Sequence, residues 1–228
     1  MTMKEIKDRV SIQVGLSGYS FRIQAEQFEH SSGWMGAERI FSTPEFQKRY
    51  EDVELSVFTP KCTLVPAQFH IAENSRQMLS DVVALADDDA VEYVAVPEFA
   101  AVMLYSNTPV GSIVRVISET VLRTDGTKAK ALPETYYMLK HLQEIPDYNK
   151  ILVSYKDEHL YLVIAQGKSL LFCNTFKAPD FTTAQYFIFL AMKKLQLNPE
   201  VSSIFFRTPL DQEQEMSLYR YFKNVEQI

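Results

Sequence analysis

Two pairs of glycines have a spacing that suggests a ligand site, because backbone N–H groups in glycine-containing turns can hold phosphates. The pairs are Gly15/Gly18 and Gly33/Gly36, each separated by two residues. The same spacing is far more common in ordinary turns, where glycine allows φ > 0. The chain has only 7 glycines and no Gly-Gly pair. We therefore interpret both pairs as turns.

Other residues with catalytic or metal-binding chemistry are scattered along the chain. There is no Gly-x-Ser-x-Gly motif, no His-Glu-x-x-His motif and no Cys-x-x-Cys pair. Asp87–Asp89 lacks the alternating ligands and the glycine of a calcium loop, so it predicts a solvated acidic turn. The four histidines are far apart: His30, His70, His141 and His159. The sequence predicts no catalytic residue, no metal ligand and no cofactor.

Trp34 is the one residue whose setting suggests a contact with another molecule. It is the only tryptophan, and it lies between Gly33 and Gly36 in a predicted loop. Exposed tryptophans in loops often anchor protein interfaces. A tryptophan can equally fold back onto the core of its own domain, and the sequence leaves both interpretations open.

Composition indicates a packed globular protein without affinity for nucleic acids. Hydrophobic residues make up 46% of the chain and charged residues 23%, close to the values for folded domains. The net charge is −6 and no basic run is present. Nucleic acids and anionic membrane surfaces are bound through Lys and Arg. Neither class of partner is therefore expected.

Hydropathy and cysteine usage predict a cytoplasmic protein without membrane insertion. Met1–Val10 is charged and lacks the apolar core of a signal peptide. The longest apolar run, Tyr186–Met192, is too short to span a bilayer. Cys62 and Cys173 lie in separate apolar runs, which indicates two reduced, buried thiols.

Alternating hydrophobic residues and turn residues predict the elements of the first half. Ser11–Ile23 alternates on both sides of Ser17-Gly18, which is typical of a hairpin. Arg123–Lys130 is polar and predicts a linker. We expect further strands at Arg39–Phe41, Val53–Phe58, Thr63–Val65, Val91–Val96 and Ala100–Tyr105. We expect helices beginning at Thr43-Pro44 and over Asn74–Leu85, Ile113–Leu122 and Thr135–Leu142.

The second half has clearer element boundaries. We expect three consecutive antiparallel strands at Ile151–Ser154, Leu160–Ala165 and Ser169–Phe176. A helix over Phe181–Leu197 should begin at Asp180 or Thr182, and a strand over Val201–Phe206 should follow it. The last helix is predicted over Asp211–Val225, because Leu218, Tyr221, Phe222 and Val225 share one helical face.

A weak internal repeat connects the two halves. The order strand, strand, strand, helix, strand, helix occurs twice. Val14–Tyr19 in the first half corresponds to Val153–Glu158 in the second. Both fourth strands also end in Thr-Pro, at Thr59-Pro60 and Thr208-Pro209. This order predicts two related subdomains.

The repeated order resembles the plan of the actin-like ATPase fold. Lys150–Phe206 looks most like the second half of the pilus-platform members of that fold. With the motifs Ser11–Phe21 and Thr63–Pro66, nearly the whole chain is similar to an uncharacterised bacterial family that resembles degenerate relatives of the fold.

The resemblance implies an α/β protein of actin-like ATPase (ribonuclease H-like) fold. Each of its two related subdomains would have a mixed sheet, made of a three-stranded antiparallel meander plus parallel strands and flanked by helices. It implies a first subdomain over residues 1–125, a connecting helix and linker over 126–149, and a second subdomain over 150–228.

The resemblance also indicates where nucleotide chemistry would lie. In active members of the fold, an Asp on the first strand organises Mg²⁺ and the turn backbone holds phosphates. This sequence has Gln13 at that position, the turn near Val153–Glu158 has no glycine, and the Gly-Gly pair that binds adenosine has no counterpart. The resemblance therefore implies that nucleotide binding has been lost. The remaining cleft or turn positions are Gln13, Gly15, Ser17, Gly18, Ser154 and Asp157.

Three functional hypotheses follow from these patterns. The leading one is a non-catalytic scaffold or interaction protein that binds a protein partner or itself, with Trp34 as a contact residue. The second is a nucleotide- or small-molecule-binding protein that uses the cleft between the subdomains with altered ligands. The third is an enzyme of unrecognised type. Carboxylates that converge with a basic residue would favour the second and third hypotheses over the first.

Overall fold

The computed structural model describes residues 8–25 and 28–228, which divide into two compact units. Unit 1 consists of the described part of Met1–Thr59 together with Asn107–Pro133. Unit 2 consists of Pro60–Ser106 together with Glu134–Ile228. The sequence-based division at 1–125, 126–149 and 150–228 stays a prediction. Of the predicted charged segment Met1–Val10, residues 1–7 lie outside the described residues.

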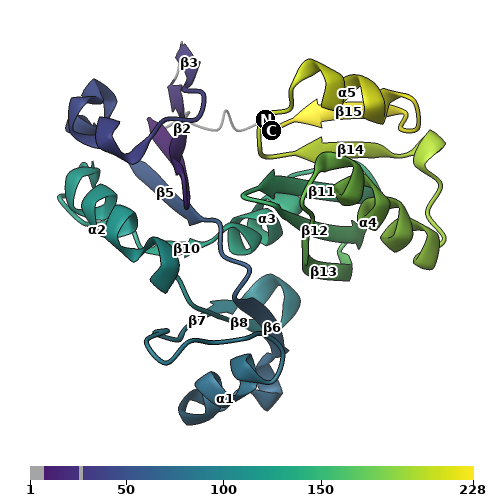
Figure 1. The fold of residues 1–228 in the computed structure, drawn as a ribbon, viewed down its shortest axis with the longest axis horizontal. Helices are drawn as coiled ribbons and strands as arrows, with labels where there is room; N and C mark the ends of the chain where they lie inside the picture. Colours follow the sequence, from purple (N-terminus) through teal and green to yellow (C-terminus); the bar gives the residue numbers. More distant parts are fainter. Residues whose placement is uncertain (1–7, 26–27) are drawn as a thin grey trace, which may run out of the picture. The chain divides into compact units, whose positions relative to one another are not determined.

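Unit 1 is built on a five-stranded mixed sheet with the order β10-β5-β1-β2-β3 (Figure 1). The pairs β1–β2 and β2–β3 are antiparallel, whereas β1–β5 and β5–β10 are parallel. The strands of this sheet are β1 (Arg9–Gly15), β2 (Gly18–Ala25), β3 (Phe28–Ser31), β5 (Asp52–Val57) and β10 (Ala131–Pro133). The other elements are the pair β4 (Arg49–Tyr50) and β9 (Leu122–Arg123), helix α2 (Gly111–Thr120), and the 3-10 helices η1 (Ala37–Ser42), η2 (Pro44–Gln47) and η6 (Thr108–Val110).

The two faces of this sheet differ, because side chains alternate along each strand. Val10, Ile12 and Val14 of β1 lie in a core with residues of α2, η1 and η2, such as Ile117 and Phe46. Each large apolar side chain buried in this way contributes about 1.5–3 kcal/mol. The opposite face carries polar residues of β1, β2 and β5: Arg9, Ser11, Gln13, Ser20, Arg22, Gln24, Asp52, Glu54 and Ser56.

Unit 2 contains a second five-stranded mixed sheet with the order β13-β12-β11-β14-β15. Its strands β11, β12 and β13 form the antiparallel meander, and β14 and β15 add in parallel beside β11. The strand order and directions therefore repeat those of unit 1. The strands are β11 (Asn149–Lys156), β12 (His159–Gln166), β13 (Ser169–Lys177), β14 (Ser203–Phe206) and β15 (Asn224–Gln227).

Helices cover both faces of the second sheet. Helices α4 (Phe181–Lys194) and α5 (Gln212–Tyr219) pack on the face that carries Ile151 and Val153. Helix α3 (Glu134–Leu142) lies on the other face, where Glu134 contacts Ser154. Asp180 caps α4 by accepting a hydrogen bond from Thr183 N at 2.7 Å, which decides between the two predicted start residues. The 3-10 helix η7 (Pro199–Val201) precedes β14.

Residues 60–106 form a smaller three-stranded antiparallel sheet with the order β6-β8-β7. The carboxylate of Asp89 is buried in this part of unit 2, where it accepts hydrogen bonds from Lys61 Nζ at 2.5 Å and Ser106 Oγ at 2.9 Å. The predicted solvated acidic turn is therefore wrong at Asp89, because a lysine distant in sequence pairs with its carboxylate. The elements are β6 (Cys62–Pro66), β7 (Glu92–Val96), β8 (Ala101–Tyr105), α1 (Ser75–Ser80), η3 (Ala67–Phe69), η4 (Ala72–Asn74) and η5 (Pro97–Phe99).

Three predicted elements are corrected by the structure. Arg39–Phe41 belongs to η1, and the third strand of the meander is β3 instead. The helix predicted over Asn74–Leu85 ends at Ser80, because the guanidinium of Arg76 holds the carbonyls of Ala86 and Asp89 in the following loop. The helix predicted over Asp211–Val225 ends at Tyr219, and Val225 lies in β15, where pairing with β14 buries it.

None of the described helices combines the length and the hydropathy needed to cross a lipid bilayer.

Candidate functional site

The first hairpin, β1–β2, requires glycine at one position. Gly15 and Gly18 pair at its end, and Gly18 has φ of +141°. The backbone of Met35 pairs with Tyr19 through two hydrogen bonds, at 2.9 and 2.8 Å. A Cβ on Gly18 would lie 2.0 Å from the carbonyl oxygen of Met35. Gly18 is therefore explained by the close approach of this loop.

Gln13 lies in the middle of β1 with 8% of its surface exposed. It pairs with Ser20 of β2 on one side and with Ser56 of β5 on the other, and both serines are also buried. The row Ser20–Gln13–Ser56 can donate and accept hydrogen bonds but carries no charge at neutral pH. A hard cation such as Mg²⁺ prefers carboxylate oxygens, and this row provides none.

Trp34 is half-buried and lies against the first hairpin. Its Nε1 donates a hydrogen bond to Ser17 Oγ at 3.1 Å, and its ring centroid lies 6.2 Å from that of Phe58. One part of the indole thus packs on unit 1, and the other part stays exposed. These contacts bring three of the predicted site residues, Ser17, Gly18 and Trp34, to the same end of the sheet.

The second hairpin, β11–β12, turns at Asp157-Glu158, since Lys156 pairs with His159. Both turn residues have positive φ, +49° and +57°, a conformation that costs L-residues about 1–2 kcal/mol each. Burial lowers the pKa of Lys156, and the nearby Asp157 opposes that shift. The turn places two carboxylates where a phosphate-binding turn would offer glycine amides.

A buried polar cluster lies at the end of β11. Ser154 Oγ donates a hydrogen bond to Glu134 Oε1 at 2.7 Å, and Arg207 Nε lies 3.6 Å from the same oxygen. The Glu134 side chain is 0% exposed and the Arg207 side chain 7%. The Arg207 guanidinium also lies over the ring of Tyr137, 5.8 Å from its centroid. One carboxylate thus pairs with a basic residue here, whereas the arrangement expected from the sequence for a chemical site has two or more carboxylates that converge on a basic residue.

The structure places the predicted site residues in two groups. Gln13, Gly15, Ser17, Gly18 and Trp34 belong to unit 1. Ser154 and Asp157 belong to unit 2. Sequence reasoning missed Glu134 and Arg207. Glu134 directly follows Pro133 at the start of a helix, and Arg207 directly follows β14, but no spacing in the sequence connects them.

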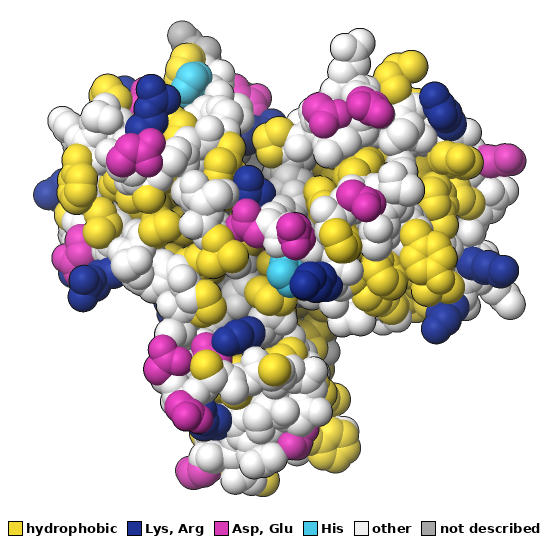
Figure 2. Space-filling model, in the orientation of Figure 1, with side chains coloured by type: hydrophobic (Ala, Val, Ile, Leu, Met, Phe, Trp, Pro, Cys, Tyr) yellow, Lys and Arg dark blue, Asp and Glu magenta, His cyan; other side chains and the backbone are white. Residues whose placement is uncertain are grey.

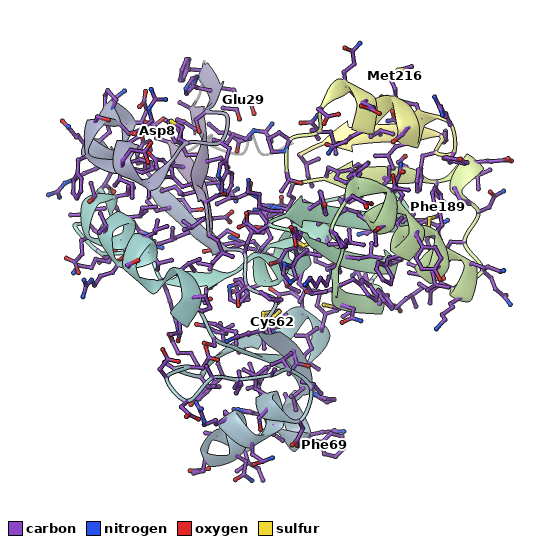
Figure 3. All side chains as sticks on the ribbon, viewed as in Figure 1. Asp8, Glu29, Cys62, Phe69, Phe189 and Met216 are labelled. Carbon is purple, nitrogen blue, oxygen red and sulfur yellow. The ribbon has the colours of Figure 1, made fainter. Side chains whose placement is uncertain are left out.

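Other sites for ligands are limited within the described residues. Among residues 8–25 and 28–228, no three His, Cys, Asp or Glu side chains come together as a metal site. Cys62 and Cys173 are half-buried free thiols, and burial raises the pKa of Cys62 to about 11. An open depression at the start of α5 is lined by Asp211, Gln212, Glu213 and Met216, the last labelled in Figure 3.

The two sheets and their equivalent hairpins define the class of this protein, which has the actin-like ATPase fold. The chain belongs to the family described as "Protein of unknown function (DUF3822)", whose model matches residues 6–225. A search of curated proteins found no match.

A solved structure confirms the fold that the sequence resemblance implies. A Bacteroides thetaiotaomicron protein described as having an actin-like ATPase fold and unknown function is 13% identical, with a TM-score of 0.66 over 98% of this chain and 91% of that chain. A PilM–PilN type IV pilus biogenesis complex is 14% identical, with a TM-score of 0.48 over 97% and 88%. The Ppx/GppA phosphatase of Aquifex aeolicus is 11% identical, with a TM-score of 0.34 over 88% and 67%. At these identities the likeness concerns the fold alone.

Proposed function

We propose that this protein is a non-catalytic scaffold that works by binding another protein, and that it no longer binds nucleotides. The observation that carries the proposal is the uncharged, buried row Ser20–Gln13–Ser56. An ATPase of this fold needs a carboxylate in that row to organise Mg²⁺ and its waters. Gln13 is neutral, and its amide cannot replace the charge of a carboxylate.

The second hairpin supports the same proposal through charge. Asp157 and Glu158 occupy both central positions of its turn, where two negative charges disfavour a polyphosphate. Glu134 engages Arg207 and Ser154 at the same end of β11. The only carboxylate that converges with a basic residue in this cluster is therefore already committed to a contact within unit 2.

Trp34 is the contact residue that we propose for the protein partner. Its indole contacts Ser17 and Phe58, and the side chain as a whole is partly exposed. A large aromatic side chain that is fixed before binding loses little conformational entropy when a partner covers it. The free thiols of Cys62 and Cys173 are consistent with a cytoplasmic site of action.

Co-purification from native lysate tests the partner hypothesis with a matched pair of variants. Trp34→Ala should weaken retention of the partner by about tenfold or more, as expected for an aromatic hot spot. Phe41→Ala is the control, because Phe41 is 74% exposed in the same unit and is not assigned to the contact. Trp34→Ala should also lower the free energy of unfolding by about 1–2 kcal/mol, through its lost aromatic contact. If both variants retain the partner equally, Trp34 is not part of the contact.

We also propose that the two units arose by duplication of one ancestral subdomain. The support is the identical order and direction of strands in the two sheets. Under this proposal the boundaries at 1–125, 126–149 and 150–228 describe the duplicated parts and their connection, except that β10 joins the first sheet from within 126–149. Separate expression of 150–228 tests this, because a duplicated subdomain with its own core should fold cooperatively.

A further inference from the structure

Strand β13 is the longest strand among the described residues and lies at the edge of the second sheet. It runs over nine residues, Ser169–Lys177, and pairs only with β12 on its inner side. Within the described residues, no other strand pairs with its outer edge. An edge of this length presents a row of backbone N–H and C=O groups to which another chain can bind.

The backbone groups at the outer edge can be identified from the pairing register. Thr175 is paired with Tyr161, and its N–H is bonded to the side-chain oxygen of Asn174 at 2.9 Å instead of to β12. Cys173 lies two residues away and points its backbone groups in the same direction, because strand geometry repeats every two residues. A bulge between Ile164 and Ala165 of β12 interrupts the ladder near Leu171. The regular part of the outer edge therefore runs from Phe172 to Lys177.

Side chains along this edge are uncharged in the middle and positively charged at both ends. Ser169–Phe176 contains no charged residue and no proline, whereas exposed lysines flank it at Lys168 and Lys177. Neither lysine makes an ion pair within the described chain. The half-buried rings of Phe172 and Phe176 stack on each other and extend to Phe187 of α4. Figure 2 shows hydrophobic side chains gathered over α4 and toward β13.

We propose that the outer edge of β13 receives an extended segment of a partner protein, which adds to the second sheet as a sixth strand. The charge pattern specifies its chemistry: an uncharged middle with Asp or Glu at both ends, facing Lys168 and Lys177. A carbonyl of the segment replaces the side-chain oxygen of Asn174 at Thr175 N. Main-chain hydrogen bonds supply affinity in this mode of recognition, and the side chains at the ends supply specificity. The inference deepens the proposed scaffold function and rests on it.

Pairing of two copies of this chain at the same edge is disfavoured by charge. In an antiparallel pair centred on Cys173, Lys177 of one copy lies opposite Ser169 of the other copy and beside its Lys168. Like charges brought close together on neighbouring strands are destabilising. A segment with acidic ends removes this repulsion and replaces it with attraction.

The test uses two labelled peptides with the same centre of alternating Thr and Val. One peptide carries Glu at both ends and the other carries Lys, and binding to the full chain is followed by fluorescence anisotropy. The Glu-ended peptide should bind about tenfold tighter or more. The double variant Lys168→Glu/Lys177→Glu should reverse that preference. Both lysines are exposed, so this variant should keep the fold.

Thr175→Pro removes the outward N–H without breaking the ladder to β12, and proline is tolerated on an edge of this kind. It should abolish binding of the Glu-ended peptide, while Thr175→Val should retain it. Equal affinity for the two peptides, no binding of either, or full binding by Thr175→Pro would overturn the proposal. A dimer of the wild type that Thr175→Pro dissociates in sedimentation would assign the edge to a second copy and overturn it too. The scaffold function is tested separately by co-purification with the Trp34→Ala variant. These outcomes would therefore overturn the β13 proposal without contradicting the scaffold function.

Discussion

The sheets of the two units share one strand order but differ at their edges and faces. In unit 1 the edge strand β3 has four residues, among them His30 and Glu29. Glu29, labelled in Figure 3, forms an ion pair with Arg22. The equivalent strand β13 of unit 2 has nine residues and no internal charge. A short, charged edge discourages pairing with other chains, whereas a long edge without internal charge permits it. Two sheets of the same topology therefore differ in whether their edge strand can accept another strand.

The two units also differ in their sheet faces and in their hairpin turns. One face of the first sheet is polar and holds Arg9 and Glu54, whereas both faces of the second sheet carry helices. The turn of the first hairpin relies on Gly18, whereas the second uses Asp157 and Glu158 at positive φ. Both hairpins keep the backbone of the fold, and under the proposed function neither of them binds Mg²⁺ or phosphate.

Phe21→Ala should produce the largest loss of stability, because Phe21 of β2 is buried in the core of unit 1. Removing a core phenylalanine costs about 3–5 kcal/mol. Phe28→Ala on the neighbouring β3 is the control, since Phe28 is 57% exposed and its loss should cost about 0.5 kcal/mol or less. Urea denaturation measures both values. Similar losses for the two variants would mean that β2 does not form the core of its sheet.

Glu134→Gln should destabilise the protein more than Glu54→Gln. Each carboxylate is buried and pairs with an arginine and a serine: Arg207 and Ser154 for Glu134, Arg9 and Ser11 for Glu54. Loss of Glu134 leaves the charge of a nearly fully buried Arg207 uncompensated, which costs about 3 kcal/mol.

Glu54→Gln should cost about 1–2 kcal/mol. Arg9 is more exposed than Arg207, with 23% of its side chain accessible, and it keeps Asp52 at 3.7 Å as a second partner. Thermal and urea unfolding of both variants measure the difference. A larger loss of unfolding free energy for Glu54→Gln than for Glu134→Gln would show that the Glu54–Arg9 pair, and not the Glu134–Arg207 pair, is the more important for stability.

Substitutions in the two hairpin turns should have opposite signs. Gly18→Ala should cost roughly 2–3 kcal/mol, because its φ of +141° and the carbonyl of Met35 leave no room for a Cβ. Gly33→Ala is the control, since nothing lies within 4 Å of the added Cβ. Glu158→Gly relieves a positive φ and should stabilise the protein by about 0.5 kcal/mol. Destabilisation by Glu158→Gly would show that contacts of the Glu158 side chain stabilise the protein by more free energy than its positive φ costs.

The sequence predicted those parts of the fold that rest on local patterns. The hairpin of β1 and β2 follows from alternation around Ser17-Gly18, and the start of α4 follows from the capping residue Asp180. Strand β15 was missed because Val225 shares a helical face with Leu218, and only pairing with β14 decides between helix and strand.

Features that depend on distant contacts could not be predicted. Glu134 pairs with Arg207, and Asp89 pairs with Lys61, across separations that carry no periodic signal. The open edge of β13 is likewise invisible in the sequence, because a strand becomes an edge only through the order of the whole sheet. The predicted turn position Ser17 and the contact residue Trp34 do lie together, but their contact joins a hairpin to a loop.

Thermal unfolding with and without millimolar Mg-ATP tests whether the protein has lost nucleotide binding. A ligand present at roughly 100 times its Kd stabilises the folded state by about 2.7 kcal/mol, which raises the Tm of a protein of this size by several degrees. We predict a shift near zero, because Gln13 lies in an uncharged row and the second turn carries Asp157 and Glu158. A shift of several degrees that Gln13→Ala abolishes would contradict the account and show that the first hairpin still binds nucleotide.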